Sequence, residues 1–522
     1  MNTRRALLAA GAAVLAGCNR VPEITGGFTG ASPERGHLLR DGLPAGTPSV
    51  VRRTQVVIAG GGIAGLAAAR ALRQRGIEDF VVLDVEDAPG GNSRGGSVAG
   101  IACPLGAHYL PAPGDDAPEV QALLEELGLR KRVAGRWIND ERHLCHNPQE
   151  RLFFRGRWQD GLLPMDDVGA ATLAQYRRFA QLVDELRGRT RFAIPASVHP
   201  WLPEHLQLDT LTFAAWLSRN GLDDAQLRWY LDYCCRDDYG AGLDAVSAWA
   251  GLHYFAARHG FHVPGEGAGD GERDAVFTWP EGNGFLSRAL AAPLKERFRP
   301  ARLVRRIAQT RSGVEVDAFD CAARTHERWQ AAHCIVALPV FVAARVVENP
   351  PAILQRRAAH CRYAPWLVAN LHLRAPLDDR PGAALSWDNV IHGAPGLGYV
   401  VATHQSLDPR PGPTVLSWYM APGEAQRGAL LQRPWTAWRD AGLAELSVPH
   451  PDVAAKCTRI EIARYGHAMA IPRPGTFATA GAPPAAGRLG FAHADWAGYS
   501  VFEEAFTLGH RAGLHARQRG TI

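Results

Sequence analysis

The chain has 522 residues, enough for two or three domains, and 46% of them are hydrophobic, enough to build packed cores. That composition excludes a largely disordered protein. The formal net charge is only +5, and no basic run is interleaved with aromatic residues, which argues against a nucleic-acid-binding groove.

The first eighteen residues have the pattern of an export signal. Arg4 and Arg5 precede an apolar stretch over residues 6–17. A helix of that length rises only about 18 Å, too little to span a bilayer. The segment around the arginines resembles a twin-arginine signal, and Leu15–Cys18 resembles a bacterial lipobox. We therefore predict a signal peptide over residues 1–18.

In a lipobox, Cys18 is acylated and becomes the mature N-terminus. We expect the export machinery to deliver the protein to the periplasmic side of a bacterial membrane, with that lipid as its one membrane contact. The alternative is an ordinary secretory signal with an incidental cysteine. Residues 19–50 contain several Gly and Pro and no strong period, so we predict a linker there.

A glycine-rich turn between an apolar strand and an alanine-rich helix predicts a dinucleotide site. The spacing G-x-G-x-x-G falls at Gly60, Gly62 and Gly65. The first glycine permits a tight turn, the second lets a pyrophosphate approach the backbone, and the third lets helix and strand pack closely. Unpaired N–H groups at the helix start, around Ile63 and Ala64, would bind the phosphates.

The next strand ends in an acid at a suitable spacing. Phe80–Leu83 is apolar and is followed by Asp84, 24 positions after Gly60. A carboxylate about 20 residues beyond the first glycine binds ribose hydroxyls in such sites. Because strand, helix, second strand and acid are all in register, a glycine-rich loop without function is the weaker interpretation.

The remaining chain divides by its periodicity. Residues 131–280 read as mainly helical, whereas residues 302–338 and 360–420 contain strand patterns. A final helix closes the chain, and Ser500 with Glu503 predicts a capping box at its start. Only one dinucleotide fingerprint is present, so no separate NAD(P)H site is expected. No cysteine pair has metal-ligand spacing, and we predict no metal site.

Five patches of the chain resemble the flavin-dependent amine oxidase superfamily, which includes protoporphyrinogen oxidases and phytoene-desaturase-like enzymes. They are similar to the family's glycine pair, the loop beside the flavin ring, a helix start, the strand leaving the cofactor domain and the closing flavin segment: Ala88–Asn92, Leu105–Tyr109, Gly282–Leu286, Ile335–Pro339 and Phe491–Gly513. The resemblance implies FAD as the cofactor.

The resemblance also implies an α/β fold with two domains. A discontinuous Rossmann-like FAD-binding domain would comprise residues 51–130, 281–345 and 455–522. A mixed α+β substrate domain would comprise residues 131–280 and 346–454. The residues expected to bind the cofactor are Gly60, Gly62, Ile63, Ala64, Gly65, Asp84, Gly90, Gly91, Asn92, Gly106, Ala107, His108, Val304, Asp495, Ser500 and Val501.

Three departures from the family pattern stand out. Asn92 occupies a position where the family usually has Arg, and His493 one where it usually has Gly. Many amine oxidases place a Lys near the flavin, but the corresponding segment, Tyr363–Leu373, contains none. The missing Lys weakens the expectation of amine oxidation without affecting that of flavin binding.

Several side chains are candidates for the chemistry. His108 adjoins the flavin loop and is a candidate base, although fixing the backbone is the simpler role. Tyr465 and His467 fall where the family often places an aromatic over the flavin; the alternative is a structural hydrogen-bonded pair. Trp366 could wall the cavity.

An acidic pair and an aromatic set could serve a cationic substrate. Asp237 and Asp238 are adjacent, although such pairs are more often caps or solvated turns. The aromatic set could line a pocket or cage a cation, but helical spacing favours a core role: Trp216, Trp229, Tyr230, Tyr233, Trp249 and Tyr254.

We predict an FAD-dependent oxidoreductase that takes a hydride from a small-molecule substrate onto flavin N5 and passes electrons to oxygen or another acceptor. The substrate is either an amine or an apolar C–H compound, as in desaturase-like or porphyrinogen-oxidase-like enzymes. The alternative is a flavin-containing binding or maturation protein without turnover.

Overall fold

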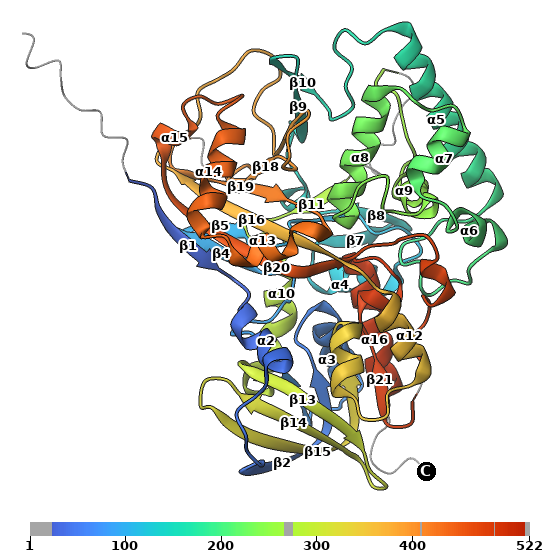
Figure 1. The fold of residues 1–522 in the computed structure, drawn as a ribbon, viewed down its shortest axis with the longest axis vertical. Coiled ribbons are helices and arrows are strands. Elements are labelled where there is room, and N and C mark those ends of the chain that lie inside the picture. The colour runs from blue at the N-terminus through green and yellow to red at the C-terminus, as the bar shows by residue number, and fades with distance from the viewer. Residues whose placement is uncertain (1–22, 266–274, 408–409, 485, 517–522) are drawn as a thin grey trace, which may run out of the picture.

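The computed structural model describes residues 23–265, 275–407, 410–484 and 486–516. The predicted signal peptide, with Cys18, lies outside these residues. Two sheets organise the fold, one above the other in Figure 1. The lower sheet carries the glycine-rich turn, and the upper sheet contains most of the strands of the predicted substrate domain.

The lower sheet, named the cofactor sheet, has seven strands and a parallel centre. An antiparallel meander extends one side of it. In order, its strands are β12 (Phe298–Arg299), β3 (Phe80–Leu83), β2 (Val50–Ala59), β15 (Thr325–Val336), β14 (Val314–Asp320) and β13 (Arg302–Gln309), with β21 (Leu489–Phe491) also paired to β15.

The second half of β2 is buried on both faces, which explains its unbroken apolar run. Val56 and Ile58 belong to one hydrophobic cluster, and Val57 and Ala59 belong to another, as expected from the two-residue period of a strand. The first cluster includes α3 (Ile63–Gln74), α4 (Pro118–Glu126), α10 (Gly284–Ala291) and α16 (Phe502–His515), and the second includes α11 (Val340–Val346) and α12 (Ala352–His360).

The upper sheet, named the substrate sheet, has eight strands in a mixed arrangement. Its order is β1 (Thr25–Thr29), β20 (Cys457–Ala470), β16 (Tyr363–Leu373), β19 (Thr414–Met420), β18 (Tyr399–Val401), β17 (Asp388–Ile391), β9 (Glu150–Phe154) and β10 (Arg157–Asp160).

Each face of the substrate sheet is covered by its own group of helices. Val368 of β16 packs with the helices at the upper right of Figure 1, whereas Leu367 and Ala369 face the opposite group. The first group is α5 (Ala170–Arg189), α6 (Pro203–Leu208), α7 (Phe213–Arg219), α8 (Ala225–Tyr239) and α9 (Ala248–Ala256); the second is α13 (Arg427–Gln432), α14 (Trp435–Leu446) and α15 (Val453–Lys456).

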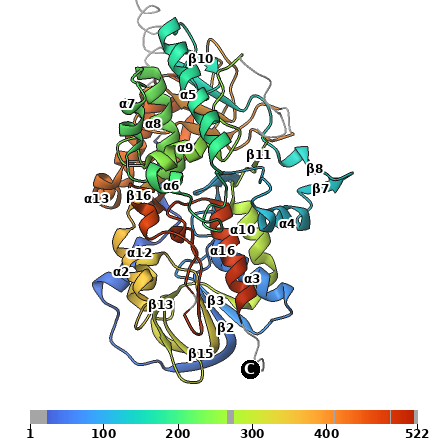
Figure 2. The same cartoon turned by 90° about the vertical axis from the view of Figure 1, so that its right-hand side faces the viewer.

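Three two-stranded ribbons complete the fold. They are β4 (Gly95–Val98) with β5 (Ile101–Pro104), β6 (Tyr109–Pro111) with β11 (Val276–Thr278), and β7 (Arg130–Val133) with β8 (Arg136–Asn139). The last ribbon projects from the body in Figure 2. The prediction of a mainly helical span over 131–280 therefore missed the strands β7 to β11.

The predicted linker is wrong where a strand and a helix form within it. Thr25–Thr29 is β1, a parallel edge strand of the substrate sheet, and Pro33–Asp41 forms the helix α2. The Gly and Pro residues that suggested a tether occupy the turns and the helix start instead: Gly30 and Gly42 have positive φ, and Pro33 opens α2. Residues 23–24, 30–32 and 42–49 lack regular structure within this part of the described chain.

The predicted domain segments need more than one shift of boundary, because α12, which falls in the predicted substrate domain, packs with the cofactor sheet. Strands of the cofactor sheet come from all three expected segments, but β20 pairs within the substrate sheet. The closing segment joins the cofactor sheet only at β21. No helix in the described ranges combines the length and apolar character needed to cross a membrane. The eight cysteines of those ranges are unpaired, and most are buried.

Candidate active site

The glycine-rich turn has the strained geometry that its sequence predicts. Gly60 has φ +104°, and a Cβ added there would lie 2.2 Å from the Ala337 carbonyl oxygen. A Cβ on Gly65 would lie 1.9 Å from the carbonyl oxygen of Gly60. Gly62 caps α3 without any side-chain hydrogen bond, so the first N–H groups of the helix stay available for an anion.

Asp84 holds the glycine-rich turn in place through backbone hydrogen bonds. Its carboxylate accepts hydrogen bonds from the amides of Gly61, at 2.5 Å, and Glu86, at 2.8 Å. Desolvation raises the pKa of Asp84 to about 6, despite these two amides. The acid that is predicted to bind the ribose is therefore held in place by the turn that is predicted to bind the pyrophosphate.

A cavity of about 470 Å³ runs from this turn to the start of α16. Of the residues expected to bind the cofactor, all but Gly65 line it. Gly65 instead packs against the backbone of Gly60, so its role is to keep strand and helix close. The segment after β3, the loop at residues 106–108 and the chain near residue 500 all meet at this cavity.

The helix after the glycine-rich turn and the last helix of the described chain pack against each other beside the cavity. Helices α3 and α16 lie side by side in Figures 1 and 2. A Cβ on Gly509 would lie 2.0 Å from the carbonyl oxygen of Ala64, so glycine permits this approach. The opening turn and the closing helix thus form one site, as the sequence predicted.

The predicted capping box does not form. The N-cap of α16 is Val501, and no side chain caps this helix. The Ser500 hydroxyl accepts a hydrogen bond from the Ala470 amide at 3.0 Å, and Glu503 is buried facing the cavity. The first amides of α16 are consequently left for a ligand, which a capping box would have partly satisfied.

Asp495 lines the cavity, but its carboxylate is held by the protein. It accepts hydrogen bonds from the Val340 amide, at 2.9 Å, and the Tyr363 hydroxyl, at 2.7 Å, and pairs with His493 at 3.1 Å. Burial acts to raise the pKa of Asp495, but His493 and these hydrogen bonds outweigh it and lower the pKa. His493, one departure from the family pattern, is therefore the partner of a buried acid.

Asn92, another departure, connects the two sheets. Its side-chain amide donates to the Ala468 carbonyl of β20 at 2.5 Å, and its own carbonyl accepts from the Ala107 amide at 2.8 Å. Asn92 thus holds the loop at residues 104–109, which we name the flavin-side loop, against the substrate sheet at the cavity wall.

Three side chains of the substrate sheet hold consecutive carbonyls of that loop. Asn370 donates to Pro104 at 2.9 Å, Tyr465 to Leu105 at 2.8 Å, and Tyr419 to Gly106 at 3.3 Å. Tyr465 therefore has a hydrogen-bonding role besides lining the cavity. Sequence patterns gave no sign of Tyr419, because its partner lies over 300 positions away.

The other predicted catalytic side chains also reach the cavity. Trp366 lines it, and His467 lies 4.9 Å from the ring of Phe341, centroid to centroid. Desolvation lowers the pKa of His467 to about 4 and that of His108 to about 3, so both rings are neutral near pH 7.

His108 stands where the first cavity meets a second one of about 1370 Å³. Its ring lies 4.3 Å from that of Tyr419 and 5.4 Å from that of Trp387, centroid to centroid. The residues that line both cavities are His108, Tyr109, Pro111, Asp237, Arg258, Tyr419 and Glu503. The second cavity therefore opens onto the first beside the flavin-side loop.

Both residues of the predicted acidic pair line the first cavity, but Asp237 alone of the two also lines the second. Asp238 pairs with Arg258 at 3.1 Å, whereas Asp237 faces the second cavity with Asp388 of β17 and Glu150 of β9. Desolvation, then the charge of Asp238, raises the pKa of Asp237 to about 7. Desolvation also raises the pKa of Asp388. Sequence reasoning missed Asp388, since it comes from a distant strand.

The predicted aromatic set also divides. Tyr230, Tyr233 and Tyr254 line the second cavity, and Trp387, Tyr109 and Tyr419 join them. Trp216, Trp229 and Trp249 line neither cavity and pack in or against the hydrophobic core beneath the helices. The three lysines of the chain, at positions 131, 295 and 456, line neither cavity. No group of acids, His and Cys within the described ranges is arranged to hold a metal ion.

Comparison with known proteins defines the class. The family model for flavin-containing amine oxidoreductases matches residues 63–512, and the chain belongs to this family. The Mycobacterium tuberculosis protein AofH, which carries the name flavin-containing monoamine oxidase, is 28% identical over 298 residues, 57% of this chain and 59% of AofH. Human amine oxidase B is 27% identical over 58% of this chain and 54% of its own length. The match spans less than two thirds of these relatives.

Solved structures show the same fold. A putrescine oxidase variant superposes with a TM-score of 0.68 over 89% of this chain and 98% of its own, at 18% identity. Cyclohexylamine oxidase from Brevibacterium oxydans gives 0.63 over 88% and 98%, also at 18% identity. The family is flavin-containing, which makes FAD the cofactor. The glycine turn at one end of the first cavity and the uncapped α16 near its other end suit that molecule.

Proposed function

We propose that this protein is an FAD-dependent oxidoreductase that oxidises an amine. The observation that carries the proposal is the junction of the two cavities. The cavity with the dinucleotide turn opens, at His108 and Tyr419, onto one walled by aromatic rings and the carboxylates of Asp237 and Asp388. An apolar C–H substrate has no use for those carboxylates, whereas an ammonium group does.

Bound FAD would supply the redox step by accepting a hydride at N5 and passing the electrons to oxygen or another acceptor. The chain supplies positioning and charge. Tyr109, Trp387 and Tyr419 can pack against the alkyl part of an amine and exclude water. Asp237 can attract the ammonium group and, because its pKa is about 7, accept its proton at neutral pH to leave a neutral amine.

The absence of Lys from β16 favours one alternative, the oxidation of an apolar substrate. Without a Lys on β16, dehydrogenation of an apolar ring or polyene would use the same cofactor cavity. A binding or maturation protein without turnover is the third reading. The carboxylates of the second cavity favour the amine.

Anaerobic reduction of the bound flavin tests the proposal. We expect amines to bleach its visible absorbance and expect cyclic or polyene hydrocarbons to leave it unchanged. Asp237→Asn should lower the second-order rate about 30-fold, since a hydrogen bond to a charged group contributes about 1.5–3 kcal/mol. Asp160→Asn is the matched control, because Asp160 is an exposed carboxylate of β10 outside both cavities. Bleaching by hydrocarbons but by no amine would reverse the assignment, and bleaching by no donor would favour the binding protein.

We also propose export and attachment to a membrane through a lipid on Cys18. The support is the sequence pattern of Arg4, Arg5 and Leu15–Cys18. Cys18→Ala should release the protein from the membrane fraction and abolish labelling with a radioactive fatty acid. Retention of the label would contradict the assignment of Cys18. Replacing both arginines with Lys should block export, and unchanged export would point to an ordinary secretory signal.

A further inference from the structure

The segment before the family match has a structure of its own, and we name residues 25–42 the N-terminal brace. The family model begins at residue 63, so nothing in that match assigns a role to the brace. It contains β1 and α2 joined by a turn at Gly30. Figure 1 shows α2 beside both sheets, below the edge strand β1.

One end of the brace is fixed to the substrate sheet. All five residues of β1 pair in parallel with β20, from Thr25 beside Arg459 to Thr29 beside Ala463. The guanidinium of Arg464 lies 3.8 Å from the ring centroid of Phe28, an additional cation–π contact.

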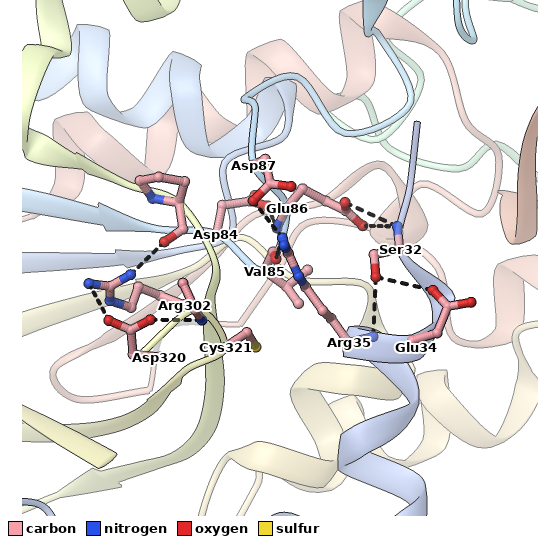
Figure 3. Close-up of polar contacts among 12 residues, drawn as sticks. Ser32, Glu34, Arg35, Asp84, Val85, Glu86, Asp87, Arg302, Asp320 and Cys321 are labelled. Carbon is pink, nitrogen blue, oxygen red and sulfur yellow. Dashed lines mark hydrogen bonds and ion pairs between the residues drawn. The ribbon is translucent and has the colours of Figure 1, made fainter. Parts of the chain in front are cut away.

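The other end is fixed to the loop that follows Asp84. The Ser32 amide donates to both carboxylate oxygens of Glu86, at 3.0 and 3.1 Å, and Figure 3 shows these contacts. Arg35 donates to the Val85 carbonyl at 3.3 Å and to Asp87 at 2.7 Å. Every residue from Val85 to Asp87 is therefore in contact with the start of α2.

The same loop is held from its other side by the dinucleotide turn. Asp84 accepts from the Gly61 amide, and its own carbonyl accepts from the Arg302 amide at 2.6 Å. Glu86 also pairs with buried Arg94 at 3.3 Å. The loop thus lies between the glycine-rich turn and α2. Because Val85 and Glu86 line the first cavity, a displacement of α2 would move part of its wall.

Two residues of α2 complete the cavity wall. Gly36 and Leu39 line the first cavity together with Val85, Glu86 and Val304. This is the end of the cavity near Asp84, the predicted ribose acid, so it would face the adenosine half of a dinucleotide. No residue of α2 is fully buried by the protein alone, and a nine-residue helix is marginal without tertiary contacts.

We propose that the N-terminal brace is an additional cofactor-binding segment, in which Gly36 and Leu39 contact the adenosine half of FAD and Arg35 and Ser32 hold the segment in place. Docking of α2 and binding of FAD then stabilise each other, because coupling between two binding events is reciprocal. The proposal concerns retention of the cofactor and does not depend on which substrate is oxidised.

Limited proteolysis of the unaltered full chain gives the first test. Trypsin can cleave after Arg35, whose side chain is 27% exposed. We expect saturating FAD to slow this cleavage at least about fivefold relative to the FAD-free chain. The rate of cleavage after an exposed arginine distant from the cavity, Arg189, should not change. Equal protection at both sites, or none at Arg35, would overturn the proposal.

Affinity for FAD gives the second test, with flavin fluorescence as the readout. Leu39→Ala and Arg35→Ala should each weaken FAD binding about 3- to 10-fold, since each removes a contact of about 1 kcal/mol. Arg35→Lys should recover part of the loss. Arg40→Ala is the matched control, because Arg40 lies on the same helix, is 62% exposed and, among the residues that the structure describes, pairs with its neighbour Asp41 alone. Unchanged FAD affinity in the Leu39 and Arg35 variants would overturn the proposal, as would an equal loss in the Arg40 variant.

Discussion

The two cavities of this protein are built in opposite ways. The first cavity, here called the cofactor cavity, is shaped largely by backbone: glycines at the turn, free amides at the starts of α3 and α16, and a loop held by its carbonyls. The second cavity, here called the substrate cavity after its proposed role, is shaped by side chains that converge from α8, α9, β9, β17 and β19. A backbone site tolerates almost no added atom at its close contacts, whereas a side-chain site can be altered one group at a time.

That difference predicts the largest effect at the turn. Gly65→Ala places a methyl group 1.9 Å from the Gly60 carbonyl, so the turn must open. We expect FAD affinity to fall more than about 100-fold, because overpacking commonly costs 1–3 kcal/mol and the phosphates lose aligned amides as well. The flavin content of purified protein measures this. Gly188→Ala on α5, where a Cβ meets nothing within 4 Å, should leave it unchanged. Normal flavin content in the Gly65 variant would mean that the backbone is not the decisive element.

The substrate cavity should show a pH dependence set by the carboxyl group of Asp237. Asp237 has a pKa of about 7, so it is ionised above that pH and protonated below it. If the ionised form attracts the substrate, flavin reduction by an amine should slow about tenfold per pH unit below pH 7 and level off above it. The groups that act on Asp237 are Asp238, Arg258, Arg236 and Tyr109, and Asp388, Glu150 and Glu503 line the same cavity.

Asp237→Asn should abolish the slowing of flavin reduction below pH 7, the acid limb of the pH profile, while leaving FAD affinity unchanged. His108 and His467, with pKa values of about 3 and 4, are neutral throughout this window and cannot produce the limb. Anaerobic stopped-flow traces between pH 5 and 9 provide the measurement. An acid limb that persists in the variant would assign it to another group.

Loss of the Asp84 side chain should have an intermediate effect confined to the cofactor. Asp84→Ala removes the acceptor for two loop amides and the predicted ribose contact. We expect FAD to bind about 10-fold more weakly, equal to about 1.4 kcal/mol, with the rate of reduction at saturating FAD unchanged. Fluorescence titration measures the affinity. A rate that falls together with the affinity would show that the two regions are coupled more tightly than their contacts suggest.

The smallest expected effect lies at the boundary of the two regions. Tyr465→Phe removes one hydrogen bond, to the Leu105 carbonyl, and keeps the ring. A neutral hydrogen bond contributes about 1 kcal/mol, so we expect flavin reduction to slow about 3- to 5-fold and the visible flavin spectrum to shift. Tyr176→Phe, which also removes one hydroxyl hydrogen bond to a carbonyl, that of Pro164, but outside both cavities, is the control. An unaltered spectrum and rate would mean that Tyr465 only fills space.

The acidic pair shows where sequence reasoning stops. Asp237 and Asp238 are adjacent, and the sequence suggested one function for both. On α8, however, successive residues point about 100° apart, because a helix has 3.6 residues per turn. Asp238 therefore pairs with Arg258, and Asp237 lines the second cavity together with Asp388, which lies 151 positions along the chain. No local pattern contains that information.

The N-terminal segment shows the same limit for composition. Its Gly and Pro content predicted a linker, but β1 forms because β20 offers an unpaired edge, and α2 forms because the loop after Asp84 holds its first turn. Edge pairing and docking are long-range contacts, which a count of turn residues cannot detect.

The sequence alone determined the strand, turn, helix and acid of the cofactor site, and the order of the family patches, because each depends on neighbours a few residues apart. Tertiary structure alone decided that Asp388 joins Asp237, that Tyr419 and Tyr465 hold the flavin-side loop, and that α2 faces the cofactor cavity. These contacts join residues far apart in the chain, and only the packing of the two sheets brings them together.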